Sequence, residues 1–265
     1  MRFVIDHDYH LHTNLSSCCH EEEQTTERLL RYAEKNGLRD ICLTNHFWDD
    51  TVCEPTKWYA PQNFAHIASA RPLPQSDKVR FHFGCEGDMN ERFIIGIGQE
   101  VRKEMELLVV PFTHMHMKEF VPTETPVEER ANLYVQRMDV FMGSDLPDGK
   151  TGIAHMTTPL IARAQWTDHI RLLEMIPDDV FRYEFSRAAQ RNFGIELNMD
   201  LAKYAPEELQ SVLRPYFIAK ECGCKFYLGS DAHSAAALEG AMKRFEDMVS
   251  ALDLTEEDKF CPFES

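Results

Sequence analysis

The chain has 265 residues, 43% of them hydrophobic, and a formal net charge of −16. This length and composition are typical of a globular protein with a substantial core, and we expect one domain over residues 1–265. The negative charge argues against a surface for nucleic acid or for an anionic membrane. A small anionic substrate is still compatible with it, because a bound metal ion can invert the local field.

The N-terminus and the cysteines indicate a cytoplasmic protein. The first residues are too polar for a signal peptide, and no apolar run reaches the length of a membrane span. Cys42, Cys85 and Cys224 lie in apolar runs that resemble strands, where a reduced cysteine acts as a small hydrophobe. CxxC pairs and zinc-ribbon spacing are missing. We therefore expect a reducing compartment.

Short apolar runs alternate with longer amphipathic ones along the chain. The apolar runs predict seven strands, at Arg2–His10, Asp40–His46, Val79–Glu86, Leu107–His114, Thr151–His155, Gly194–Asn198 and Lys225–Ser230. The amphipathic runs predict helices at Thr26–Asn36, Pro61–Ala70, Glu91–Met105, Val127–Met142, Asp178–Arg191, Glu207–Cys222 and Ala235–Leu252. Seven such repeats fit a parallel α/β barrel better than an open doubly wound sheet.

The first strand leads into the polar stretch VIDHDYHLHTNLSSCCHEE, residues 4–22. Side chains alternate along a strand, so Asp8, His10 and His12 share one face and His7 points the other way. The loop that follows carries three further candidate ligands, Cys18, Cys19 and His20.

Polar side chains also stand at the end of every later strand. In chain order they are Asn45 and His46, Glu86, His114 and His116, His155, Glu196 and Asn198, and Asp231 and His233. In a parallel barrel these ends meet at one face, where such folds build active sites. Imidazoles with a few carboxylates suit zinc, manganese or iron, and we interpret the set as a metal site. The remaining histidines are interpreted as structural, namely His7, His66, His82 and His169.

The strand ends resemble the motifs of the PHP domain, a family named for polymerase and histidinol phosphatase. The matching segments are DYHLHT (8–13), LTNH (43–46), GCE (84–86), THM (113–115), AHM (154–156) and SDAH (230–233). The resemblance implies a single PHP-type metallohydrolase domain over residues 1–265. It also implies a distorted (β/α)7 TIM-like barrel with a trinuclear metal site, in agreement with the seven predicted strands.

The resemblance further implies ligands for two or three divalent ions of zinc, manganese or iron. The first ion would be bound by His10, His12, Glu86 and Asp231. The second would share Glu86 and add His114 and His155. The third would be bound by His46, His233 and His20.

Some positions keep alternatives. Cys18 and Cys19 compete with His20 as the ligand from the first loop, and His116 competes with His114. 

Other positions have supporting roles. Asn45 stands where the family usually has aspartate, which removes a carboxylate but keeps the ligand His46. Asp8 and Asn198 are interpreted as residues that orient ligands.

The predicted activity is hydrolysis of a small phosphate monoester similar to histidinol phosphate, by a metal-activated water. The catalytic residues are predicted to be Glu86, Asp231 and His233, and either Asp231 or His233 would move the proton. Candidate contacts to the substrate phosphate are Arg163 and, as alternatives, Arg187 and Arg191. Other functions that fit are a broader phosphoesterase for nucleotides, sugar phosphates or cyclic phosphates, and a non-catalytic metal-binding regulatory module.

Overall fold

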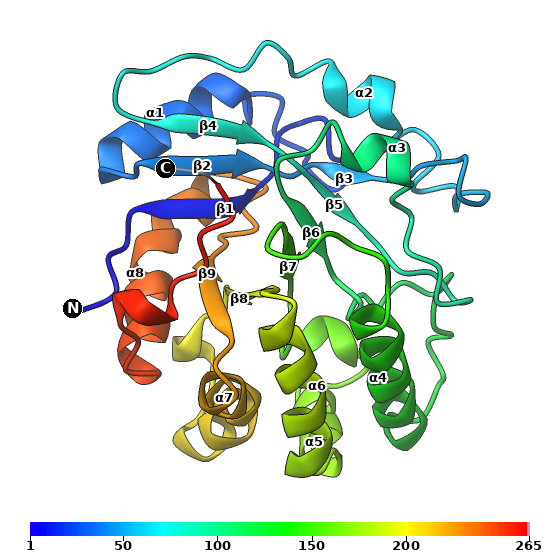
Figure 1. Cartoon of the computed structure of the whole chain (residues 1–265). Helices are drawn as coiled ribbons and strands as arrows, with labels where there is room; N and C mark the ends of the chain where they lie inside the picture. Colours follow the sequence, from blue (N-terminus) through cyan, green and yellow to red (C-terminus); the bar gives the residue numbers. More distant parts are fainter. Residues whose placement is uncertain (264–265) are drawn as a thin grey trace.

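The computed structural model describes residues 1–263, so the last two residues of the predicted domain, 264 and 265, lie outside the described part. The strands are β1 (His7–Leu11), β2 (Asp40–Leu43), β3 (His46–Phe47), β4 (Arg80–Phe83), β5 (Cys85–Gly87), β6 (Leu108–Val110), β7 (Thr151–Ile153), β8 (Gly194–Leu197) and β9 (Lys225–Leu228). Within residues 1–263 they form two sheets, ordered β1-β2-β4 and β3-β5-β6-β7-β8-β9. All neighbours in both sheets are parallel, and helices surround the strands (Figure 1).

Two of the seven predicted strands pass from one sheet into the other. The second is divided into β2 and β3, and the third into β4 and β5. Between β2 and β3, Thr44 donates its backbone N–H to Leu11 O, and its hydroxyl accepts from Leu11 N. Between β4 and β5, a Cβ on Gly84 would lie 2.4 Å from Leu107 O, so only glycine permits this close approach. The seven predicted strand regions are therefore present, in nine pieces.

The first and last strands meet at their C-terminal ends. Asp231 N donates to His10 O at 2.8 Å, and His12 N donates to Ala232 O at 3.3 Å. Leu11 and Ala232 form a parallel bridge. The polar residues that follow β1 and β9 are therefore neighbours, although more than 200 residues separate them in the sequence.

The helices are α1 (Thr26–Asn36), α2 (Phe64–Ala68), α3 (Gln99–Arg102), α4 (Val127–Met142), α5 (Asp168–Met175), α6 (Asp178–Gln190), α7 (Pro206–Glu221) and α8 (Ala235–Ala251). Of these, α1 and α4 have the predicted bounds, and Gly37 ends α1 in the left-handed conformation. None of the helices formed by residues 1–263 is long and apolar enough to cross a membrane.

Two predicted elements differ markedly from the structure, and one helix was not predicted. The first strand begins at His7, because residues 3–6 have no strand partner. The helix predicted at Glu91–Met105 is wrong except for α3. There the Asn90 carboxamide accepts from two backbone N–H groups, and Met89 pairs with Ile95 in an antiparallel bridge, so the chain turns back. The helix α5 was not predicted.

Side chains fill the space between the strands of the two sheets. A buried cluster there consists of Tyr9, Cys42, Leu107, Val109, Ala154, Tyr227 and Phe260. Phe260 follows α8 and packs against Tyr227, which places the C-terminal segment beside β9. The eight cysteines are free thiols, and those predicted to lie in strand regions are buried as small apolar residues. Because the interior is filled, a functional site is expected at the polar C-terminal ends of the strands.

Candidate metal centre

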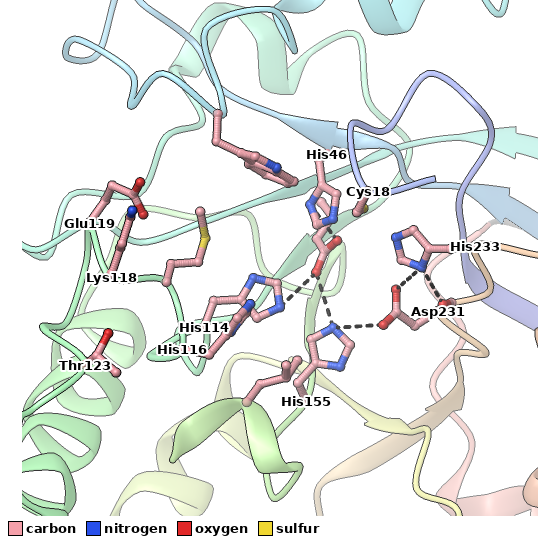
Figure 2. A pocket seen from close by; sticks show the side chains of 14 residues that line it. Cys18, His46, His114, His116, Lys118, Glu119, Thr123, His155, Asp231 and His233 are labelled. Carbon is pink, nitrogen blue, oxygen red and sulfur yellow. Dashed lines mark hydrogen bonds and ion pairs between the residues drawn. The ribbon is translucent and has the colours of Figure 1, made fainter. Parts of the chain in front are cut away.

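Side chains from the strand ends line a cavity of about 670 Å³ (Figure 2). From the strand ends come His46, Glu86, His114, His155, Asp231 and His233. The rest of the wall consists of Cys18, Trp58, His116, Met117, Lys118, Glu119, Thr123 and Leu160. His10 and His12 lie next to this cavity and are fully buried. The structure thus brings together the predicted ligands from six of the seven strand regions.

Glu86 lies at the centre of the cluster, and its side chain is fully buried. Its Oε2 is 3.3 Å from Nε2 of both His10 and His12, and 2.9 Å from Nδ1 of His46. Burial alone would raise the pKa of Glu86, but His46 and His10 hold it well below its usual value. One carboxylate oxygen therefore faces three imidazoles.

The other oxygen of Glu86 faces a second pair of imidazoles. Oε1 is 3.3 Å from Nε2 of His155 and 3.7 Å from Nε2 of His114, and the two rings stack with centroids 5.0 Å apart. A carboxylate with ligands grouped at each oxygen has the arrangement that bridges two metal ions.

Potential ligand atoms lie within 4.8 Å of one another in four groups. These are His10–His12–Glu86–Asp231, Glu86–His114–His155, His12–His46–His233 and His10–His155–Glu196. The first two coincide with the sets that the PHP resemblance implies. The third contains His12 where the resemblance implies His20, and the fourth adds Glu196, a strand-end residue that was not predicted to bind a particular ion.

The donor atoms of this centre fit divalent cations. Both carboxylate oxygens of Glu86, Nδ1 of His46 and Nε2 of His233 are buried and make no well-formed hydrogen bond, although Oε2 of Glu86 lies 2.9 Å from Nδ1 of His46. Buried polar atoms in proteins are almost always satisfied, and unsatisfied ones destabilise the fold. Imidazole and carboxylate donors in this number are the ligands that zinc, iron and manganese take in proteins.

Two buried carboxylates fix the rings of the ligands. Nδ1 of His10 is 2.5 Å from Oε1 of Glu196, and Nδ1 of His114 is 2.9 Å from Oδ2 of Asp88. An acceptor at Nδ1 keeps the proton there and leaves Nε2 free to face Glu86. The sequence analysis did not identify Asp88. Its position two residues after Glu86 could have indicated it, because residues two apart along a strand point to the same face. The similar spacing of Glu196 and Asn198 is the corresponding signal on β8.

His12 is held in the same way by the first loop. Its Nδ1 lies 2.8 Å from the Ser16 hydroxyl, which donates to Oδ1 of Asn45 at 2.9 Å and so accepts from His12. Asn45 also accepts from Thr13 N and donates to the Thr13 hydroxyl. A carboxylate could not make this last bond, so the asparagine that departs from the family pattern ties the loop to the strand.

Asp8 and Asn198 have different supporting roles. Asp8 Oδ1 accepts from the backbone N–H groups of Ser230 and His10, and burial raises its pKa to about 6. It therefore joins the first and last strand regions and does not touch the imidazole of His10. The Asn198 amide lies 2.7 Å from Nδ1 of His155, in the orienting position expected for it.

Two of the candidate ligands have left-handed backbone. The φ angles are +56° at His155 and +52° at Asp231. Residues other than glycine rarely adopt this region, and such strain costs about 1–3 kcal/mol where the surroundings impose it. This left-handed conformation turns the chain shortly after β7 and after β9. The turns place Nε2 of His155 3.6 Å from Oδ2 of Asp231.

Four ligand candidates, Cys18, Cys19, His20 and His116, and the candidate phosphate contact Arg163 lie outside the ligand groups. His20 is exposed and does not line the cavity. His116 lines it, but burial lowers its pKa to about 3 and its ring packs edge-on to His114. Arg163 is exposed and lies near His116 without lining the cavity. A lysine of the cavity wall, Lys118, was not predicted, because no sequence pattern in its loop indicated a contact with the cavity.

The alternatives Arg187 and Arg191 are wrong as phosphate contacts. Arg187 pairs with Asp139 and Glu184. Arg191 pairs with Asp148 and donates to backbone carbonyls of residues 142–146, which precede β7. Both therefore lie at the amino ends of the strands, opposite the cavity.

Arg137 of α4 supports the loops that carry Asp88 and His114. It is 1% exposed, and its guanidinium donates to the carbonyls of Met89, Asn90 and Phe112 at 2.6, 3.0 and 2.5 Å. We expect Arg137→Met to lower the free energy of unfolding by about 3 kcal/mol, because it leaves buried carbonyls unpaired. Urea denaturation measures this. Arg171→Met, at a half-exposed arginine of α5, is the control and should change little; equal effects of the two variants would contradict the bracing role.

Removal of metal is expected to destabilise the protein. The buried unpartnered donors of the centre lose their cations, and at a free metal concentration of 100 Kd the lost stabilisation is about 2.7 kcal/mol. Since each kcal/mol shifts Tm by about 2–4 °C in chains of this size class, we expect a drop of several degrees. Thermal melts before and after chelation, and after re-addition of Zn²⁺ or Mn²⁺, measure it. Superimposable melts from protein shown to have lost its metal would rule out this coupling.

No family model matches the chain, and no curated protein matches it. Among solved structures, the chain is similar to a histidinol phosphate phosphatase from Lactococcus lactis subsp. lactis, in complex with zinc, L-histidinol and phosphate. The TM-score is 0.57 at 15% identity, over 92% of this chain and 93% of the other. A probable 2-pyrone-4,6-dicarboxylic acid hydrolase from Acinetobacter baumannii, with citric acid bound, gives 0.46 at 13% identity over 93% of both chains. At these identities the first likeness shows a shared fold: the chain is a mixed α/β protein with parallel sheets, similar in architecture to that phosphatase.

Proposed function

We propose that the chain is a metal-dependent phosphoesterase of the PHP type, built on a distorted (β/α)7 barrel, which hydrolyses a small phosphate monoester similar to histidinol phosphate. The observation that carries the proposal is Glu86, whose two oxygens each face a group of imidazoles at a cavity. The shared fold with a phosphatase crystallised with zinc, L-histidinol and phosphate supports it.

The proposed ligands follow the groups described above. His10, His12, Glu86 and Asp231 would bind one ion, Glu86, His114 and His155 a second, and His46 and His233 a third. Zinc, manganese or iron, when bound, would lower the pKa of a coordinated water from about 15.7 toward 7 and hold phosphoryl oxygens.

Asp231 is the carboxylate best placed to move a proton. Its side chain is 26% exposed, whereas that of Glu86 is fully buried. Burial would raise the pKa of Asp231, but His233 and His155 hold it well below its usual value, so it is an ionised base. His233 stacks on His12 with centroids 4.1 Å apart, and its Nδ1 donates to Asp231 O. This orients His233 beside the proposed base as the alternative proton carrier.

The cavity favours a small substrate. Its volume of about 670 Å³ is within the range of small-molecule sites. Trp58, Met117 and Leu160 supply apolar wall for the leaving group. Lys118 is, within residues 1–263, the cationic side chain that lines it, and we assign it rather than Arg163 to an anionic group of the substrate.

A substrate panel with each metal tests the function. Phosphate release is measured from histidinol phosphate, p-nitrophenyl phosphate, a nucleoside monophosphate, a sugar phosphate and bis(p-nitrophenyl) phosphate, with Mn²⁺, Zn²⁺ or Fe²⁺. We expect the highest kcat/KM for histidinol phosphate or a similar amino-alcohol monoester. A clear preference for another substrate would favour the broader phosphoesterase. If protein shown to carry metal turns over none of these substrates, the remaining interpretation is a non-catalytic metal-binding regulatory module.

A further inference from the structure

The third ligand group, His12, His46 and His233, contains three imidazoles and no carboxylate. His46 is 5% exposed, and its Nδ1 lies 2.9 Å from Oε2 of Glu86 without forming a hydrogen bond of good geometry. Nε2 of His233 is buried and has no hydrogen-bond partner. His12 is already close to Glu86 and Asp231, at 3.3 and 3.1 Å, and so belongs to the first group as well. An ion held by His46 and His233 therefore needs a donor from another part of the chain.

Cys18 reaches this group from the loop after β1. It is half-buried, and it lines the cavity beside His46 and His233 (Figure 2). Its side chain lies next to the His46 imidazole. Cys18, His46 and His233 thus border the same part of the cavity, although none of the groups of ligand atoms within 4.8 Å includes the Cys18 sulfur.

The loop is held in a way that gives this position to Cys18 and not to its neighbours. Ser17 N donates to Oε1 of Gln62, and Cys19 N donates to Ser16 O, which forms a turn. The turn directs the thiol of Cys19 away from the ligand nitrogens and onto the backbone carbonyl of His233, at 3.1 Å.

His20, the ligand expected from the resemblance, lies after this turn. Its side chain is exposed and is absent from the cavity wall. Of the three first-loop candidates, the cavity therefore receives only Cys18.

Building on the proposed function, we propose that Cys18 binds the third metal ion as a thiolate, together with His46 and His233. Binding releases the thiol proton to solvent as the sulfur–metal bond forms. A thiolate with two imidazoles prefers zinc or iron to manganese or magnesium. The first and second sites, which contain carboxylates beside their imidazoles, accept zinc, iron and manganese. The chain would then select a softer ion at the third site than at the other two.

Cobalt substitution tests this without reference to catalysis. The full-length protein is stripped of metal, titrated with Co²⁺ and followed by absorption spectroscopy. We expect a thiolate-to-cobalt charge-transfer band in the near ultraviolet, which Cys18→Ser removes together with about one bound ion per chain. Cys19→Ser and His20→Ala are matched controls from the same loop and should keep both the band and the stoichiometry.

The outcomes separate this proposal from the proposed function. A band that survives Cys18→Ser, or full cobalt loading of the wild type without any band, would overturn the assignment of Cys18. Cys18→Asp should restore the third ion without the band, which distinguishes a lost ligand from a damaged fold. If the band depends on Cys18 but the protein hydrolyses no phosphate ester, the assignment of Cys18 as a metal ligand is supported and the proposed phosphoesterase activity is refuted.

Discussion

Replacing Glu86 by glutamine is expected to lower kcat by about 10³-fold or more, the scale on which principal catalytic groups act. One oxygen of Glu86 faces His10, His12 and His46, and the other faces His114 and His155. An amide removes the negative charge and presents an NH₂ group to one of these sets, so one metal position loses its bridging ligand. Turnover of p-nitrophenyl phosphate, measured over a range of metal concentrations, and bound metal by elemental analysis test this.

The matched control is Glu119→Gln. Glu119 is an exposed carboxylate of the same cavity wall, outside every ligand group, so the same chemical change should alter kcat only a few-fold. If Glu86→Gln keeps its full metal content and near-normal turnover, Glu86 is not the bridging ligand and the proposed mechanism fails.

Replacing Glu196 by glutamine is expected to weaken metal binding by about 10–100-fold, the usual effect of losing a hydrogen-bond partner of a ligand. Glu196 is 1% exposed; Oε1 accepts from Nδ1 of His10 at 2.5 Å, and Oε2 accepts from His155 N at 3.1 Å. Glutamine has one oxygen for these two donors, so its NH₂ group must face one of them. Because His10 belongs to the proposed first site and His155 to the proposed second, both sites should weaken together.

Competition with a chromogenic chelator measures the affinities, and kcat at saturating metal should recover most of its wild-type value. That recovery distinguishes a positioning role from direct participation in catalysis. Glu184→Gln is the control, since Glu184 is an equally buried carboxylate on α6 that pairs with Arg187 far from the cavity. Unchanged affinities in Glu196→Gln would show that the imidazoles need no support from this residue.

The strand regions and the clustering of the strand-end histidines could be predicted because both depend on local patterns. Buried strands appear as apolar runs. The residue that follows each run lies at the C-terminal edge of the parallel sheets, whichever strands pair with each other. The break at Gly84 was not predictable, because it depends on the distance to Leu107 O, on a strand that comes later in the chain. The failed helix at Glu91–Met105 has an amphipathic pattern, but side-chain hydrogen bonds from Asn90 favour a turn.

The supporting residues of the centre depend on long-range partners. Glu196 and His10 are 186 residues apart in the sequence, and Asp88 and His114 are 26 apart. Strand spacing places such carboxylates on the correct face, but it does not identify the imidazole that each one meets. The first loop is harder still, since three adjacent candidates, Cys18, Cys19 and His20, are separated only by the turn at Ser16.

The left-handed backbone at His155 and Asp231 has a consequence for engineering. At both positions glycine would fit the chain geometry with less strain, by about 1–2 kcal/mol each. A redesign for heat resistance that ranks residues by backbone preference alone would therefore discard two of the groups around Glu86 first. Protecting these two positions, and seeking added stability in the helices far from the cavity, is the safer design rule for this fold.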